Sequence, residues 1–182
     1  MSAGYAEVLG DWARIHARDC PLHIEAREPP LSAATLGAML ALQPFIRRHE
    51  GELAGLRADL ADLPGDLAED IAVLASRFAA LMNTTAVRIR IERVDSNTCK
   101  NVHTDYTDVR LITTYAGPGT DYAPHGDGDC CLERLQTGAV ALFKGRTYAA
   151  DHPACPHRSP PIAGTGASRL VLVIDTPMQD QR

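Results

Sequence analysis

Two histidines and one aspartate are the residues whose types and spacing best suit a metal centre. His103 and Asp105 lie two positions apart, so in an extended segment both side chains project from the same side of the chain. His157 follows much later, in the segment CPHRSPP over residues 155–161. Two imidazoles and one carboxylate suit Fe(II) and leave coordination positions open for an organic ligand and for dioxygen.

A buried cation is expected close to these residues. Arg169 opens the apolar segment RLVLVID, in which Val171 and Val173 share its face if the segment is a strand. If that face lines an interior, the guanidinium needs an anionic partner, such as a carboxylate that accepts two parallel hydrogen bonds. The partner could be the carboxylate of a bound ligand, or an internal acid such as Asp175 or Asp108.

Cysteines keep a second interpretation open. Cys99 lies shortly before His103, and Cys155 shortly before His157. A thiolate as a fourth ligand would favour Zn(II) in a closed tetrahedral site, and hence a non-enzymatic protein of zinc or iron homeostasis. The segment HGDGDCC over residues 125–131, with its Cys130–Cys131 pair, could make a second, labile metal contact.

Several polar residues in or near the expected strands could serve the same site. Tyr115 and Thr113 could form hydrogen bonds to a bound organic ligand, although both suit the wall of a strand equally well. Lys144 could bind a ligand carboxylate, or it could end a strand in solvent. Arg158 could orient the carboxylate that binds the metal or hold a substrate anion, and Arg110, on the opposite face of its strand from Tyr115, could form an ion pair.

The elements that must position these residues change character near residue 83. Residues 33–82 are rich in Ala and Leu, which predicts a helix after Ser32, another over 53–63, and a longer one with Asp66 as its N-cap. Apolar residues recur along the longest helix at steps of three and four: Leu67, Ile71, Leu74, Phe78 and Leu81.

Beyond residue 85 the apolar period changes to two, which is typical of strands. Strands are predicted over residues 87–92, 109–115, 139–144 and 169–175, and a short one over 22–26. The long loop over 116–138 is expected to be a lid or a partly ordered hairpin. Helices followed by such strands predict an antiparallel sandwich or small barrel with helices packed outside.

The order of the candidate ligands resembles that of the dioxygenases that use Fe(II) and 2-oxoglutarate: HxD near a strand, a distant histidine, and an arginine that opens a further strand. That resemblance implies an α+β fold, with an N-terminal, mainly helical part over 1–85 packed on a C-terminal double-stranded β-helix, a cupin-like jelly-roll barrel, over 86–178, as one compact unit. It also implies an oxygenase (hydroxylase) of unknown substrate. The iron would be held by His103, Asp105 and His157, and 2-oxoglutarate by Arg169.

A closer resemblance is to the bacterial family named domain of unknown function 1826. It covers most of residues 86–176 and is carried by the segments CKNVHTDYTDVRLITTYAGPGTDY, VALFKG, HRSPP and SRLVLVID. The segment HGDGDCC departs from the pattern of that family. Membership implies little chemistry in itself, so the candidate activity depends on the metal-binding residues.

Composition and net charge limit the classes of partner that the chain is expected to bind. The chain of 182 residues has 45% hydrophobic residues and a net charge of −5, which suits a globular protein and disfavours a nucleic-acid binder. No apolar run is long enough to cross a bilayer and no export signal is visible. We therefore expect a cytoplasmic protein without a membrane partner, whose five cysteines are free thiols. The substrate could be a small molecule or a protein, and the Ala/Leu-rich helices could support a homodimer.

Overall fold

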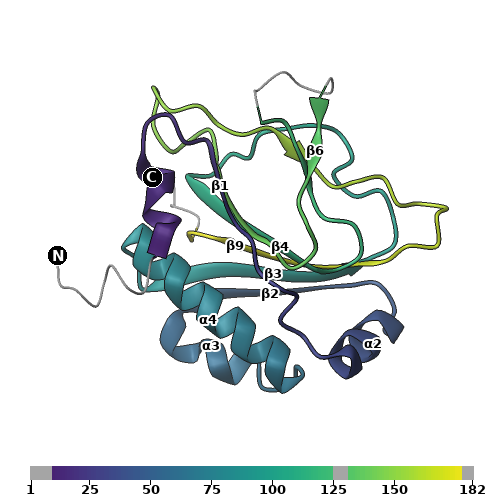
Figure 1. Ribbon diagram of the computed structural model, residues 1–182. Coiled ribbons are helices and arrows are strands. Elements are labelled where there is room, and N and C mark those ends of the chain that lie inside the picture. Colours follow the sequence, from purple (N-terminus) through teal and green to yellow (C-terminus); the bar gives the residue numbers. More distant parts are fainter. Residues whose placement is uncertain (1–9, 125–130, 178–182) are drawn as a thin grey trace.

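A computed structural model describes residues 10–124 and 131–177. Helices lie on one side of a large antiparallel sheet, and a smaller sheet lies on its other side (Figure 1). In chain order the elements are η1 (Gly10–His16), β1 (Leu22–Glu25), α2 (Ala33–Ala41), β2 (Phe45–Glu52), α3 (Leu53–Asp59), α4 (Gly65–Met82), β3 (Ala86–Val94), β4 (Val109–Ala116), β5 (Asp121–Tyr122), β6 (Glu133–Arg134), β7 (Val140–Lys144), β8 (His157–Arg158) and β9 (Arg169–Asp175).

The two sheets enclose a shared interior. The larger sheet has the strand order β1-β7-β4-β9-β3-β2 and the smaller has the order β6-β5-β8, and neighbouring strands in both are antiparallel. Ile112, Phe143 and Val173 of the larger sheet form an apolar cluster with Tyr122 of the smaller one. Two antiparallel sheets packed in this way are the arrangement of a jelly roll, which confirms the predicted class of mixed helices and antiparallel sheets.

The helices cover the opposite face of the larger sheet. The predicted apolar face of α4 packs there, and Leu67, Ile71 and Phe78 are fully buried in one cluster with Leu111 and Leu172 of the sheet. The helix ends at Asn83, which adopts the left-handed conformation (φ 51°) that commonly terminates helices. The central strands β4 and β9 are therefore buried on both faces, with helices on one side and the interior between the sheets on the other.

The longest of the strands absent from the sequence prediction is β2. β2 is an edge strand that pairs with β3 along its whole length, and its side chains alternate between half-buried and exposed. Only Phe45 and Ile46 in it are apolar, so it lacks the apolar period that identifies strands. Both edge strands, β1 and β2, come from the part over 1–85, which is therefore not only helical and shares one sheet with the part that follows.

The start of α4 also differs from the prediction. The helix begins at Gly65 with Pro64 as its N-cap, so Asp66 is not the N-cap but lies in the first turn. Its carboxylate accepts hydrogen bonds from the Thr35 hydroxyl (2.6 Å) and the Ser32 backbone N–H (2.9 Å), and these bonds lower the pKa of Asp66 to about 2. Asp66 thereby joins the beginnings of α2 and α4.

The loop over 116–138 contains a hairpin, because β5 pairs with β6. Cys130 and the other residues of the segment 125–130 lie outside the described residues. The described cysteines Cys20, Cys99, Cys131 and Cys155 are free thiols, as predicted. Within the described ranges, no helix has the combination of length and hydropathy needed to cross a membrane.

Candidate metal centre

Backbone pairing places the two histidines side by side. The His103 N–H donates to the His157 carbonyl (3.0 Å), and the His157 N–H donates to the His103 carbonyl (2.9 Å). This bridge joins the segment around residue 103 to β8, which itself pairs with β5. The two imidazole centroids are 5.1 Å apart.

Asp105 is held against a neighbouring turn. The Arg146 N–H donates to the Asp105 carbonyl (2.9 Å), and a Cβ at Gly145 would lie 2.1 Å from the Thr107 carbonyl oxygen. Only glycine permits so close an approach of the two backbones. Arg110 of β4 then donates to Asp105 Oδ1 and fixes the orientation of the carboxylate.

The donor atoms of the three predicted ligands converge. One ligand atom from each of His103, Asp105 and His157 lies within 4.8 Å of the others. The Nδ1 atoms of His103 and His157 lie 2.9 Å and 3.1 Å from the carbonyl oxygens of Asn101 and Cys155. Because a carbonyl only accepts, each Nδ1 carries the proton and each Nε2 keeps its lone pair, which is the tautomer that binds metals through Nε2.

The carboxylate of Asp105 is ionised and incompletely satisfied. Burial alone would raise its pKa, but contact with His157 and the positive charge of Arg110 outweigh burial and hold the pKa below its ordinary value. Oδ2 is buried and accepts no hydrogen bond from the described residues, although it lies 3.1 Å from His157 Nε2. When His157 is neutral, its Nε2 is an acceptor that faces the Oδ2 acceptor of Asp105, and a divalent cation between them would satisfy both. The donor set fits a metal ion.

The ligands open into a cavity of about 270 Å³ between the two sheets. His103 and His157 line it, together with Arg169, Val171 and Val173 of β9. The alternation of side chains along β9 brings its odd-numbered residues to the cavity, while Leu170, Leu172 and Ile174 pack against the helices.

Arg169 is a buried cation that forms no ion pair with a carboxylate of the described residues, although Glu92 and Asp121 act on its charge from a distance. Its side chain is 2% exposed, its Nε donates to the Pro118 carbonyl (2.7 Å), and a terminal nitrogen lies 3.3 Å from the Thr120 hydroxyl. The two acids considered from the sequence are engaged elsewhere, Asp175 with Arg110 and Asp108 with a neighbouring hydroxyl and backbone N–H. Burial lowers the pKa of Arg169 to about 10.

Three further residues from the sequence analysis have different surroundings. Cys99 lines the cavity, but among the described residues its thiol does not belong to the group of converging donors. Cys155 is buried, and burial raises the pKa of its thiol to about 12, which favours the neutral thiol over the thiolate that binds metals. Arg158 lines the cavity and donates to Asp121 (3.2 Å), not to Asp105.

The structure corrects three of the expected cofactor contacts. Tyr115 and Thr113 lie on the face of β4 that packs against the helices, where the Tyr115 hydroxyl donates to Asp70 of α4 (2.7 Å) and Thr113 approaches the Gly138 carbonyl. Lys144 is buried near η1 and donates to the Ala17 carbonyl. None of the three is among the residues that line the cavity. Tyr115 and Thr113 occupy odd-numbered positions of β4, which face away from it, and Lys144 at the end of β7 reaches toward Ala17 instead.

Sequence reasoning missed the basic wall of the cavity. Arg48 of β2 and Arg90 and Glu92 of β3 also line it. The alternation along β3 predicts a polar face, but a single strand cannot show that this face meets a cavity and not solvent. The position of Arg48 at the cavity could not be predicted, because β2 has almost no apolar period and was not recognised as a strand.

Three solved structures share the fold of this chain at low sequence identity. The rice dioxygenase for auxin oxidation superposes with a TM-score of 0.56 and 14% identity, covering 99% of this chain and 80% of that one. The auxin dioxygenase 1 of Arabidopsis thaliana, in a binary complex with 2-oxoglutarate, superposes with a TM-score of 0.54 and 12% identity, covering 94% of this chain and 89% of that one. A prolyl-4-hydroxylase of Pseudomonas putida superposes with a TM-score of 0.55 and 11% identity, covering 96% of this chain and 99% of that one.

At the level of sequence, the comparison with curated proteins gives no match. The family described as protein of unknown function DUF1826 matches residues 12–175. That range contains the metal-binding candidates, Arg169 and the elements of both sheets. The chain therefore belongs to the DUF1826 family and has the jelly-roll fold found in 2-oxoglutarate-dependent oxygenases.

Proposed function

We propose that the protein is an Fe(II)- and 2-oxoglutarate-dependent oxygenase that hydroxylates an organic substrate. The observation that carries the proposal is that the His103–Asp105–His157 group lies at the same cavity as Arg169, a buried arginine without an ion pair to a carboxylate among the described residues. The relatives in fold support it, since one of them is a complex with 2-oxoglutarate.

The donor set favours iron over zinc. Two imidazoles and one carboxylate form the facial group of non-haem Fe(II) sites and leave the other positions open. A structural zinc site would need a fourth protein ligand, and among the described residues neither Cys99 nor Cys155 joins the three donors. Bound iron and 2-oxoglutarate would supply the activation of dioxygen that hydroxylation requires.

The residues around the metal would bind and orient the cosubstrate. Arg169 would pair with the distal carboxylate of 2-oxoglutarate through two charge-assisted hydrogen bonds. The Thr120 hydroxyl, beside the guanidinium, could accept or donate at the same carboxylate. Val171, Val173 and Ile112 form an apolar wall that excludes water from the space between.

Arg110 would act as a positioning residue. It donates to Asp105 and, through Nε, to Asp175 (2.7 Å), so the guanidinium is fixed from two sides. The carboxylate ligand is thereby oriented with Oδ2 toward the histidines, while the positive charge keeps it ionised. Hydrogen bonds of this kind to a metal ligand commonly tune metal affinity.

Anaerobic titration of the purified protein with Fe(II) and 2-oxoglutarate tests the proposal. We expect a weak visible charge-transfer band that requires both components and is absent from His157→Ala. Tyr115→Phe, which alters a hydroxyl on the helix side of β4, is the matched control and should keep the band. Iron that binds stoichiometrically without any band on adding 2-oxoglutarate would refute the cosubstrate, and zinc bound with a cysteine ligand would favour metal homeostasis instead.

A further inference from the structure

Two arginines face each other directly across β2 and β3, close to the metal site. Arg48 and Arg90 are register partners on these antiparallel strands, so their side chains lie on the same face. Both line the cavity that contains His103 and His157, and both line an adjoining cavity of about 260 Å³. Like charges directly opposite each other destabilise a sheet, so this pair calls for an explanation.

Among the described residues, Arg48 has no ion-pair partner and Arg90 has only a long ion pair, with Glu92. Arg48 is exposed and forms no ion pair or hydrogen bond with any of them. The carboxylate nearest to Arg90 is that of Glu92, 3.7 Å away, and the buried Nε of Arg90 has no hydrogen-bond partner. A buried donor without an acceptor is unfavourable, and an external anion would satisfy it.

The neighbouring arginines show a different pattern. Arg88 and Arg110, which line the adjoining cavity as well, both pair with Asp175. On the other side of β2, Arg47 pairs with Asp62 of the segment after α3. Unbalanced positive charge is therefore concentrated at Arg48 and Arg90.

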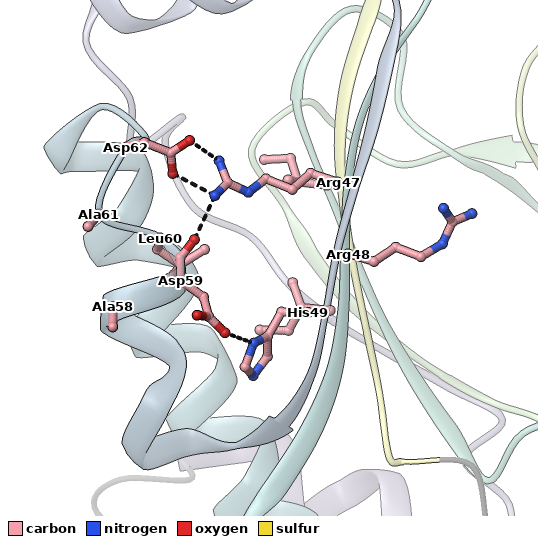
Figure 2. Close-up of a pocket in the computed structure, with 10 residues that line it drawn as sticks. Arg47, Arg48, His49, Ala58, Asp59, Leu60, Ala61 and Asp62 are labelled. Carbon is pink, nitrogen blue, oxygen red and sulfur yellow. Dashed lines mark hydrogen bonds and ion pairs between the residues drawn. The ribbon is translucent and has the colours of Figure 1, made fainter.

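Figure 2 shows this contrast within two consecutive residues. Arg47 points toward Asp62 and His49 toward Asp59, across a separate cavity of about 450 Å³ between β2 and α3, whereas Arg48 points away from them on the other side of the strand. The polar groups of that separate cavity satisfy one another for the most part, so it offers less to a ligand than the arginine pair does.

We propose that Arg48 and Arg90 bind an anionic group, a carboxylate or a phosphate, of a small organic substrate whose other end reaches the metal. The planar guanidinium suits both groups through paired hydrogen bonds. Cavities of about 270 and 260 Å³ suit a small molecule, and the net charge of −5 disfavours a polyanion. This inference deepens the proposed function and depends on it for the fate of the bound molecule, but not for the binding itself.

Calorimetric titration with benzoate, phenyl phosphate and the neutral benzamide, on metal-free protein, tests the binding. We expect at least one anion to bind and benzamide not to bind. Arg48→Gln and Arg90→Gln should each lower the affinity for the anion by about tenfold or more. Whichever of benzoate and phenyl phosphate binds the wild-type protein more tightly identifies the preferred anionic group.

Two matched variants control the titration. Arg47→Gln changes the neighbouring residue on the other face of the same strand and should leave the affinity unchanged. Arg169→Met tests whether the probe occupies the expected 2-oxoglutarate position and should also leave it unchanged. The proposal is overturned if benzamide binds as well as benzoate, if the Arg48 and Arg90 variants bind like wild type, or if only Arg169→Met abolishes binding. The titration uses metal-free protein, so its outcome does not depend on the proposed oxygenase activity. If the Fe(II) experiment gave no charge-transfer band, the oxygenase proposal would fail while the measured anion binding would stand.

Discussion

Arg169 is the residue whose two possible roles differ most clearly in their consequences. Among the described residues, the hydrogen bonds of the buried Arg169 guanidinium go to neutral oxygen atoms, which stabilise its charge poorly without a ligand. We therefore expect Arg169→Met to leave the melting temperature of the ligand-free protein unchanged or slightly raised, and to weaken 2-oxoglutarate binding by about thirty-fold or more. Scanning calorimetry and equilibrium titration measure the two quantities. Arg57→Met, at an exposed ion pair between α3 and α4, is the control. A variant that melts early and binds 2-oxoglutarate normally would assign Arg169 a structural role.

A second prediction separates the two arginines that share Asp175. Arg110 contacts Asp105 as well, whereas Arg88 pairs with Asp175 alone (3.1 Å). Arg110→Gln removes the donor that orients the carboxylate ligand, so we expect the affinity for Fe(II) or a substitute such as Co(II) to fall by about 10- to 100-fold. Arg88→Gln disturbs the same aspartate and should change the affinity far less. Equal losses in both variants would show that Asp175, and not Asp105, transmits the effect.

At the scale of elements, Asp66 connects the two helices that begin on the same side of the sheet. Its depressed pKa, about 2 against an ordinary 3.8, means that the ionised form stabilises the fold above about pH 4 and that this contribution is lost as the pH falls through 2. Loss of such helix-end hydrogen bonds commonly amounts to about 1 kcal/mol. Asp66→Ala should therefore lower the melting temperature by about 2–4 °C at pH 7, and the difference should shrink toward pH 2. Glu69→Ala, at an exposed pair on the same helix, should have little effect at any pH.

The helices and strands also show which parts of the fold could be predicted from the sequence and which could not. Local patterns were enough for α4 and β3, which have an apolar period, and for β4, β7 and β9, which are runs of apolar or β-forming residues that end near Gly or Pro. The converging metal ligands could be predicted too, since three residue types at a known order imply one site. The edge strand β2 could not be predicted, because its strand conformation depends on pairing with β3 and its own composition does not indicate a strand. For the same reason the cavity-facing role of Arg48 was invisible. For Tyr115 the sequence left two roles open, a ligand contact or a strand-wall residue, because periodicity identifies which residues share a face but not which of the two faces meets the cavity.

At the scale of the whole molecule, residues from distant parts of the chain hold the sheet and its helices together. The Tyr115 hydroxyl of β4 donates to Asp70 of α4, and Asp70 also accepts two hydrogen bonds from Arg27, which follows β1. Burial raises the pKa of Tyr115 well above its ordinary value, so this phenol stays a donor at all physiological pH values. The network links the part over 1–85 to β4, at the centre of the larger sheet.

This arrangement predicts that the chain unfolds as one unit and not as a helical part and a barrel. Trp12, the single tryptophan, is fully buried in η1 beneath Arg77 of α4 and reports on the N-terminal part. Far-ultraviolet circular dichroism reports on all helices and strands. Because β1 and β2 complete the sheet and α4 covers it, we expect the two signals to follow a single coincident transition in urea. Phe78→Ala, which removes a fully buried side chain from the helix–sheet core, should shift both transitions together by about 3–5 kcal/mol. If Trp12 fluorescence changed at a lower urea concentration than the dichroism, the two parts would be separate folding units, and the N-terminal strands would be dispensable for the metal site.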